Sequence, residues 1–236
     1  MDKELKHELK RDEIGEALQE ARGFLTKSEI MKPALAVIGL FIVLAGLYYG
    51  QKFRVSASES AFARATEVYH ARVGATAPAG GESFKTDNER LEKAKTMFDD
   101  VASSYSSMAA GRRARYYSAL CLVEMGKVQE AEAALKQVAA VKDPAAIEPA
   151  MASVRLAEVV LASGRAKEAA AFYKALADDS ASKLPKDQVL FGLATALEAA
   201  GEKLEARRAY TDLVNRHPQS PFAQEARLKV DVLAAL

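Results

Sequence analysis

An uncharged run of eighteen residues, from Pro33 to Gly50, constrains this chain more than any other feature of its sequence. It reads PALAVIGLFIVLAGLYYG and is bounded by Lys32 and Lys52. At a rise of about 1.5 Å per residue, a helix of this length covers about 27 Å, close to the ~30 Å hydrocarbon core of a bilayer. The run also lacks the polar stripe that a helix packed on a protein core usually carries. We predict that residues 33–50 form a transmembrane helix.

A cleaved signal peptide is the alternative interpretation of this run. Signal peptides begin with a short basic segment and contain an apolar core of about 7–15 residues. Here 32 residues that include eight acidic ones precede a longer apolar run. Nine of the eighteen residues are Leu, Ile, Val or Phe, which favours membrane insertion by about 3–5 kcal/mol. We therefore expect a retained single-span anchor.

The anchor separates a short tail, residues 1–32, from a large region, residues 51–236. Apolar spacing at about 12–25 is compatible with a short amphipathic helix in the tail. Within twenty residues of the span, three Lys or Arg lie on each side, so the positive-inside rule barely decides the orientation. Four further basic residues at 3–11 favour a cytoplasmic tail.

Charge and residue usage argue against several classes of function. The 33 Lys and Arg nearly balance 32 Asp and Glu, whereas nucleic-acid binding calls for a concentrated basic face. Cys121 is the single cysteine, which excludes an internal disulfide and a thiolate metal cluster. His7, His70 and His217 share no metal-ligand spacing. We expect no nucleic acid, no metal or other cofactor, and no small-molecule substrate.

The sequence contains no recognisable catalytic constellation. The acidic pairs Asp99-Asp100 and Asp178-Asp179 lie near predicted helix ends, where solvated acids are ordinary. The serines within 103–107 have no histidine placed to activate a hydroxyl group. We predict that the protein is not an enzyme; a hydrolase or transferase with an unrecognised site is the alternative.

A predicted helix and a loop follow the anchor. Residues 56–73 show helical apolar spacing, and residues 74–88 are rich in Gly, Ala and Pro, as loops are. Gly80-Gly81 within this loop is followed by neither a phosphate-binding lysine nor a strand–helix junction, so we expect no phosphate site there.

Three later segments align on a glycine, with steps of 38 and 37 residues. They read GKVQEAEAALKQV from Gly126, GRAKEAAAFYKAL from Gly164 and GEKLEARRAYTDL from Gly201. Five other positions recur in phase: an alanine and an aliphatic residue before the glycine, and an alanine, a large residue and an apolar residue after it. These residues are Ala119, Leu122, Ala131, Leu135 and Val138; Ala157, Val160, Ala169, Tyr173 and Leu176; and Ala194, Leu197, Ala206, Tyr210 and Leu213.

This spacing has a mechanical meaning. The glycine permits a tight turn between two antiparallel helices. Alanines on both helices let the backbones approach closely, and the large residues fill the space beside them. One hairpin cannot bury its apolar face alone, so successive copies stack. The sequence therefore predicts an all-α fold in which helical hairpins form a superhelix.

The recurring residues resemble the tetratricopeptide repeat, which has small, apolar, Gly, Ala and aromatic residues at corresponding positions and often ends in Pro. Residues 187–220 match best, through Ala194, Leu197, Gly201, Ala206, Tyr210, Leu213 and Pro218. The first aligned unit has Pro144 one residue late, and the middle unit lacks this proline. All three units lack the aromatic residue that the family places near the start of its first helix.

We predict four hairpin units and a capping helix within residues 51–236. The aligned units are at about 112–148, 150–183 and 187–220. A degenerate earlier unit at about 56–106 encloses the loop, and its second helix carries Ala94, Phe98 and Val101. A last helix at 222–236 is expected to cover the end of the stack through Phe222, Ala226, Val230 and Leu233.

The layout of tail, anchor and repeats resembles the single-span ancillary subunit of the bacterial SecYEG translocon. This resemblance implies a cytoplasmic tail, an inner-membrane anchor and a periplasmic repeat domain. It also implies partners among the secretion machinery, periplasmic chaperones or exported proteins.

Two alternatives follow from other relatives. Residues 215–230, NRHPQSPFAQEARLKV, are similar to repeats in envelope lipoproteins of the outer-membrane-assembly and Tol-Pal-associated kinds. An envelope-assembly or cell-division scaffold is therefore one alternative, although Cys121 is not near a signal peptide as a lipobox cysteine would be. A cytoplasm-facing membrane scaffold is the other.

The tetratricopeptide resemblance implies that the first helix of each unit lines a concave, partner-binding groove. The residues transferred to this groove are Arg113, Tyr116, Tyr117, Leu120, Met151, Arg155, Glu158, Phe191 and Thr195. Aromatic and Arg side chains are frequent binding anchors, and Met adapts to varied apolar partners. We expect apolar or aromatic protein segments to bind there. The alternative is that Tyr116 and Tyr117 only pack against a neighbouring unit.

Overall fold

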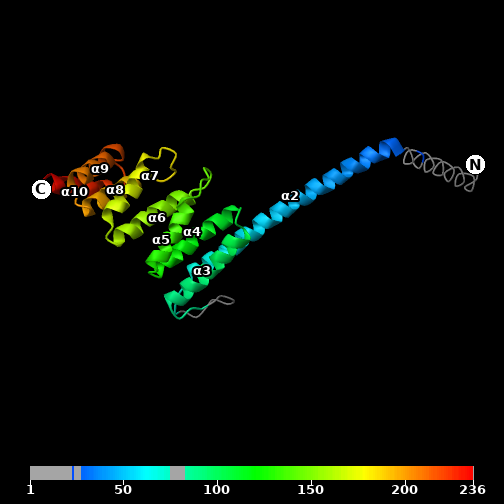
Figure 1. Cartoon of the computed structure of the whole chain (residues 1–236), viewed down its shortest axis with the longest axis horizontal. Helices are drawn as coiled ribbons and strands as arrows, with labels where there is room; N and C mark the ends of the chain where they lie inside the picture. Colours follow the sequence, from blue (N-terminus) through cyan, green and yellow to red (C-terminus); the bar gives the residue numbers. More distant parts are fainter. Residues whose placement is uncertain (1–22, 24–27, 75–82, 236) are drawn as a thin grey trace, which may run out of the picture. The chain divides into compact units, whose positions relative to one another are not determined.

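The computed structural model describes residue 23 and residues 28–74 and 83–235 (Figure 1). Most of the predicted tail, including the helix considered at 12–25, and most of the predicted loop therefore lie outside the described residues. The described part contains helices, turns and one isolated bridge between Val73 and Phe84, which confirms the all-α prediction. The chain divides into two compact units, residues 1–56 and 57–236.

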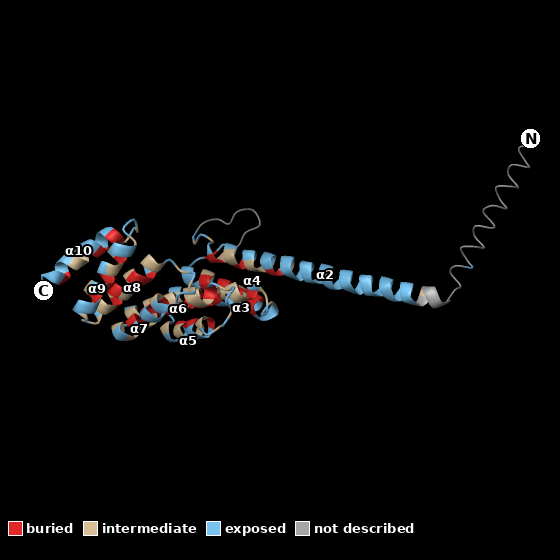
Figure 2. Cartoon of the chain, turned by 90° about the horizontal axis from the view of Figure 1, so that it is seen from above, coloured by how far each residue is buried: buried red, intermediate tan, exposed pale blue. Residues whose placement is uncertain are grey.

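Helix α2 spans Ser28–Tyr69 and contributes residues to both units. In the first unit its large apolar side chains are exposed; Leu35 is 61% and Phe41 68% exposed (Figure 2). Within the described residues, Pro33–Tyr69 is the one segment long and apolar enough to cross a membrane, and none of its most apolar window, with mean hydropathy 2.0, is buried in protein. The structure thus contains a helix suitable for spanning a membrane, and membrane anchoring by residues 33–50 stays a prediction.

Two sequence-based boundaries near α2 need correction. The expected helices at 33–50 and 56–73 are one continuous helix that ends at Tyr69. The polar residues after Gly50 do not interrupt it, because Lys, Arg and Gln are good helix formers. The loop expected to reach residue 88 ends at Thr86, whose Oγ1 accepts a hydrogen bond of 3.2 Å from the Glu89 N–H and caps the next helix.

The second unit is a stack of helices in chain order. After the last turns of α2, the helices are α3 Asp87–Ser104, α4 Ala109–Glu124, α5 Val128–Ala139, α6 Glu148–Ala162, α7 Ala166–Asp178, α8 Lys186–Ala199, α9 Lys203–Arg216 and α10 Ala223–Ala234. Each helix from α3 to α9 packs against the one that follows it (Figure 1). Contacts between neighbours dominate, as expected for a repeat superhelix.

The three aligned glycines make the same turn. Gly126, Gly164 and Gly201 have φ angles of 69°, 78° and 78°, in the left-handed region. After Gly126, the Lys127 N–H donates to the Leu122 carbonyl at 3.0 Å, and the equivalent bonds follow the other two glycines. This pattern is the Schellman motif, in which a left-handed residue ends a helix and satisfies its last carbonyls. The repeat register predicted from sequence is therefore confirmed at its turns.

The recurring alanines lie where helices touch. All six, Ala119, Ala131, Ala157, Ala169, Ala194 and Ala206, are 0% exposed. The large and apolar positions beside them are also buried, apart from Leu197, which is half-buried. Leu197 recurs in the sequence pattern with Leu122 and Val160, but it borders a groove described below. Close backbone approach at alanine, with larger residues around it, accounts for this arrangement.

The two ends of the stack have their own cores. At the first end, Ala94, Phe98 and Val101 of α3 pack with Ala65 and Tyr69 of α2. At the last end, α10 covers α9 with the buried side chains of Ala226 and Leu233, while Phe222 and Val230 are half-buried. The opposite face of α10 is open, with Leu228 63% and Val232 58% exposed.

Candidate functional site

The nine residues predicted for the concave groove all lie on helices that begin a hairpin. Those of the first aligned unit are on α4, those of the second on α6 and those of the third on α8. Leu120 and Met151 are half-buried and pack against the central core, as do Tyr116 and Tyr117. Phe191 belongs instead to the separate core at the end of the stack.

Tyr117 is half-buried in an aromatic cluster built by three helices. Its ring centroid lies 5.4 Å from Phe62, 5.7 Å from Tyr69 and 5.2 Å from Phe98. Edge-to-face and tilted arrangements of this kind stabilise beyond the area they bury. The hydroxyl of Tyr69 also donates to Glu124 of α4, and Arg90 of α3 donates to the Tyr69 carbonyl.

Arg113 is held by residues from the end of α2. Its guanidinium pairs with Glu59 at 2.5 Å and lies 4.5 Å from the centroid of the Phe62 ring. Both partners belong to the second compact unit. The charge and the flat face of the Arg113 guanidinium are therefore already engaged in contacts within the fold.

Tyr116 of α4 is 8% exposed, and two charged residues of α6, Arg155 and Glu158, act on its hydroxyl. Burial raises the pKa of its hydroxyl, Arg155 lowers it and Glu158 raises it. Arg155 and Glu158 form an ion pair of 2.8 Å, and their side chains are 36% and 41% exposed. The same two charges act on Tyr173 of α7, whose pKa burial raises to about 12. Arg155 and Glu158 are thus a partly exposed charged pair on α6, called the α6 patch below, whereas Tyr116 is buried.

Phe191 and Thr195 are bound into the end of the stack. The Phe191 ring stacks on Phe222 at 4.8 Å and meets the edge of Tyr210 at 5.9 Å. The Thr195 Oγ1 donates to the Phe191 carbonyl at 2.9 Å and lies 3.3 Å from the Tyr210 hydroxyl. Much of the predicted groove surface on α8 is thus occupied by α9 and by the segment leading to α10.

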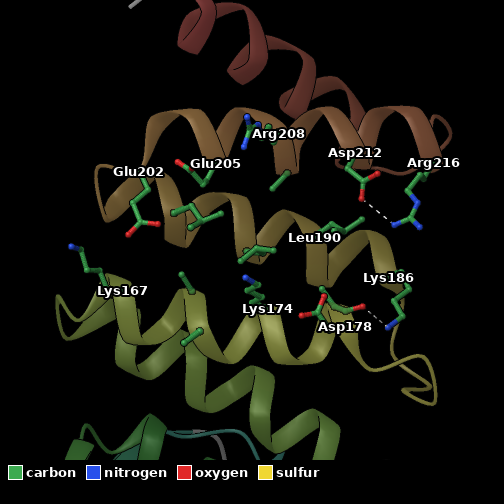
Figure 3. Close-up of a pocket in the computed structure, with 16 residues that line it drawn as sticks. Lys167, Lys174, Asp178, Lys186, Leu190, Glu202, Glu205, Arg208, Asp212 and Arg216 are labelled. Carbon is green, nitrogen blue, oxygen red and sulfur yellow. Dashed lines mark hydrogen bonds and ion pairs between the residues drawn. The ribbon is translucent and has the colours of Figure 1, made fainter.

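A surface groove between α7, α8 and α9 was not predicted from sequence. It has a volume of about 520 Å³, and its floor contains Leu190 (Figure 3) together with Leu193 and Leu197 of the same helix, α8. Their spacing of three and four residues places them on one helix face, away from Phe191 and Thr195. That spacing was a readable signal, although the same pattern is expected of a fully buried face.

Charged side chains form the two rims of this groove. Lys167 and Lys174 lie on the α7 rim, and Glu202 and Glu205 lie where α9 begins (Figure 3). None of these four has an ion pair or side-chain hydrogen bond within the described residues. The far end is different, because Arg216 pairs with Asp212 at 3.0 Å and Lys186 donates to carbonyls that end α7.

The described residues offer little for covalent or metal chemistry. They contain no group of three or more His, Cys, Asp or Glu residues that could hold a metal ion. Cys121 is 0% exposed, and burial raises the pKa of its thiol to about 12. A reactive cysteine requires thiolate character and access, and Cys121 has neither.

Comparison with known proteins identifies the class. The chain matches the model of the tetratricopeptide repeat-like domain family over residues 33–235. The chain therefore belongs to that family, whose domains generally mediate protein–protein interactions. No match was found among curated proteins.

Solved structures with similar folds include proteins described as containing TPR or TPR-like repeats. The TPR-like repeats of a Podosopora anserina protein described as a kinesin light chain superpose with a TM-score of 0.55 at 17% sequence identity, covering 76% of this chain and 85% of that one. YrrB, described as a TPR protein with an unusual peptide-binding site, gives a TM-score of 0.45 at 19% identity, covering 61% of this chain and 68% of that one. MamA from Desulfovibrio magneticus RS-1 gives 0.43 at 18% identity, covering 62% and 81%.

Proposed function

We propose that this protein is a membrane-anchored protein-binding module of a bacterial cell envelope. Residues 33–50 cross the inner membrane, the tail is cytoplasmic, and the helical hairpins stand on the periplasmic side. The observation that carries the proposal is the apolar segment of α2, whose most apolar window is not buried in protein, in the same chain as a stack of interaction repeats. Among the described residues, no group of three or more His, Cys, Asp or Glu could hold a metal ion, and the thiol of Cys121 is buried.

The proposed partners are proteins near the secretion machinery: translocon subunits, periplasmic chaperones or exported clients. The support is the layout of tail, anchor and repeats, which resembles the translocon's ancillary subunit. The α6 patch formed by Arg155 and Glu158 supports binding because its two charged side chains are partly exposed. Photocrosslinking from Met151 in native membranes, followed by identification of the captured proteins, tests the partner class directly. Recovery of outer-membrane-assembly or cytoplasmic proteins alone would contradict it.

The topology is tested by protease access. In intact spheroplasts, added protease is expected to degrade residues 56–236, because the proposed orientation places the repeats outside the inner membrane. The tail should be degraded only after the membrane is permeabilised. Immunoblotting with antibodies against the tail and the repeats distinguishes the two regions. Protection of the repeats in intact spheroplasts, with digestion after permeabilisation, would reverse the orientation.

The α6 patch is tested by removing its ion pair. The double change Arg155→Ala with Glu158→Ala is expected to reduce Met151 crosslinking severalfold and to leave the melting temperature nearly unchanged. Exposed ion pairs contribute only about 0–1 kcal/mol to stability, so a binding defect would not reflect unfolding.

A matched control exists on α7. Arg165, the residue before α7, and Glu168 also form an ion pair three residues apart, at 3.2 Å, with side chains 40% and 41% exposed; Arg165 pairs with Glu132 of α5 as well. Changing both to alanine should leave the crosslinking intact. Equal losses in the two double variants would show that the patch on α6 has no special role.

A further inference from the structure

We infer that the groove between α7, α8 and α9 is a second docking site, which binds an amphipathic helix of a partner protein with acidic side chains along one edge. The inference rests on the proposed function as a protein-binding module and adds a separate surface to it. Three observations carry it. They are the apolar floor, the exposed Lys167 and Lys174 on one rim, and the location of the groove away from the α6 patch.

The floor fits an apolar helical stripe. Leu193 and Leu197 are half-buried and so only partly covered by their own fold, whereas Leu190 is 7% exposed. Ala170 and Ala209 border them from α7 and α9 and keep the groove wide because their side chains are small. A volume of about 520 Å³ accommodates several side chains of a docked segment. Helix-in-groove recognition uses such anchors at three- and four-residue spacing.

The rims select for charge. Lys167 and Lys174 are seven residues apart on α7, which places both on the same helix face along the groove. Both are exposed and unpaired within the described residues, whereas Lys186 at the groove's far end is held by three backbone carbonyls. A ligand helix with acidic residues along one edge would pair with the two free lysines. Such complementary charges determine partner choice and orientation more than affinity.

The opposite rim favours a polar or basic second edge. Glu202 and Glu205 line the groove where α9 begins, and Arg208 lies one turn later (Figure 3); none of the three forms a side-chain ion pair with another described residue. A docked helix that exposes acids to α7 and neutral or basic groups to Glu202 and Glu205 satisfies both sides. The rim residues of α9 extend over about 21 Å at 1.5 Å per residue, so a ligand helix of about 14 residues matches the groove.

The groove is distinct from the α6 patch. Helix α8 turns Leu190, Leu193 and Leu197 toward the groove, while Phe191 and Thr195 contact Phe222 and Tyr210 on another side of the same helix. Arg155 and Glu158 do not line the groove. A partner could therefore occupy the groove without displacing one bound at the α6 patch.

The test uses the full chain in lipid nanodiscs and two fluorescent helical peptides of about 14 residues. Both peptides carry the same leucine stripe; one has glutamates along one edge, and the other has lysines at those positions. Fluorescence anisotropy measures Kd for the wild type, for Lys167→Glu with Lys174→Glu, and for a control, Lys85→Glu with Lys142→Glu. The control lysines are exposed, lie outside the groove and form no side-chain ion pair or hydrogen bond with the residues that the structure describes.

The expected result is reciprocal. Reversing the charges of Lys167 and Lys174 should raise the Kd of the glutamate peptide at least about fivefold and should lower the Kd of the lysine peptide. The control double variant should change neither Kd more than about twofold. Replacing the leucine stripe by serine should abolish binding of either peptide. Unchanged melting curves are expected for both double variants, since exposed lysines contribute little to stability.

Four outcomes would overturn the inference. They are failure of both peptides to bind, equal weakening in the control, loss of binding in the Arg155→Ala, Glu158→Ala variant instead, and self-association of the chain that the groove variant abolishes. The last would show that a second copy occupies the groove. None of the four bears on whether Met151 crosslinks to envelope proteins, so failure of the groove and failure of the proposed function are distinguishable.

Discussion

The variant Phe98→Ala is expected to destabilise the repeat domain, residues 57–236, by about 3–5 kcal/mol. Phe98 is 0% exposed, and its ring lies 5.7 Å from Phe62, 6.1 Å from Tyr69 and 5.2 Å from Tyr117. Alanine would remove the ring that these three aromatic residues share. The cavity would not collapse easily, because its walls come from α2, α3 and α4 and are also held by polar contacts.

The loss in free energy of unfolding is measured by urea denaturation, followed by circular dichroism at 222 nm because this wavelength reports helix content. Leu228→Ala is the control, since Leu228 is 63% exposed and its truncation should change stability by less than about 0.5 kcal/mol. A cost below about 1 kcal/mol for Phe98→Ala would show that the aromatic cluster does not hold α2 and α3 together.

The variant Ala206→Leu should also destabilise the domain, by about 1–3 kcal/mol, through overpacking. Ala206 is 0% exposed on α9, at the position where each second helix of a hairpin has an alanine. A leucine there has to separate α9 from its neighbours or adopt a strained rotamer, because well-packed interiors leave no void for three added carbon atoms. A lower melting temperature and a lower urea midpoint are expected.

Ala133→Leu provides the matched control for this change. Ala133 lies on α5, two residues after the equivalent alanine Ala131, and is exposed. The same substitution there adds a good helix former to the surface and should leave the melting curve in place. If Ala206→Leu and Ala133→Leu behave alike, the repeat register deduced from the glycines does not describe the packing.

Structural details that depend on distant residues were missed by the sequence analysis. Tyr117 and Arg113 were assigned to an open groove, yet their partners Phe62 and Glu59 lie more than fifty residues earlier on α2. Gly192 had no assigned role, and the structure places it against Tyr173 of the preceding hairpin, where an added Cβ would lie 2.4 Å from the ring. Local spacing does not reveal which side chain from another hairpin arrives at a given position.

The sequence by itself determined the helical class, the repeat register and the apolar run at residues 33–50. These follow from local rules: glycine permits the left-handed turns at Gly126, Gly164 and Gly201, and alanine allows close helix contact. Only the tertiary structure decided that Leu190, Leu193 and Leu197 border an open groove, that Lys167 and Lys174 on its rim are exposed, and that Tyr116 is nearly covered. The reason is physical: periodicity identifies an apolar face, whereas its exposure depends on how closely the neighbouring helices approach it.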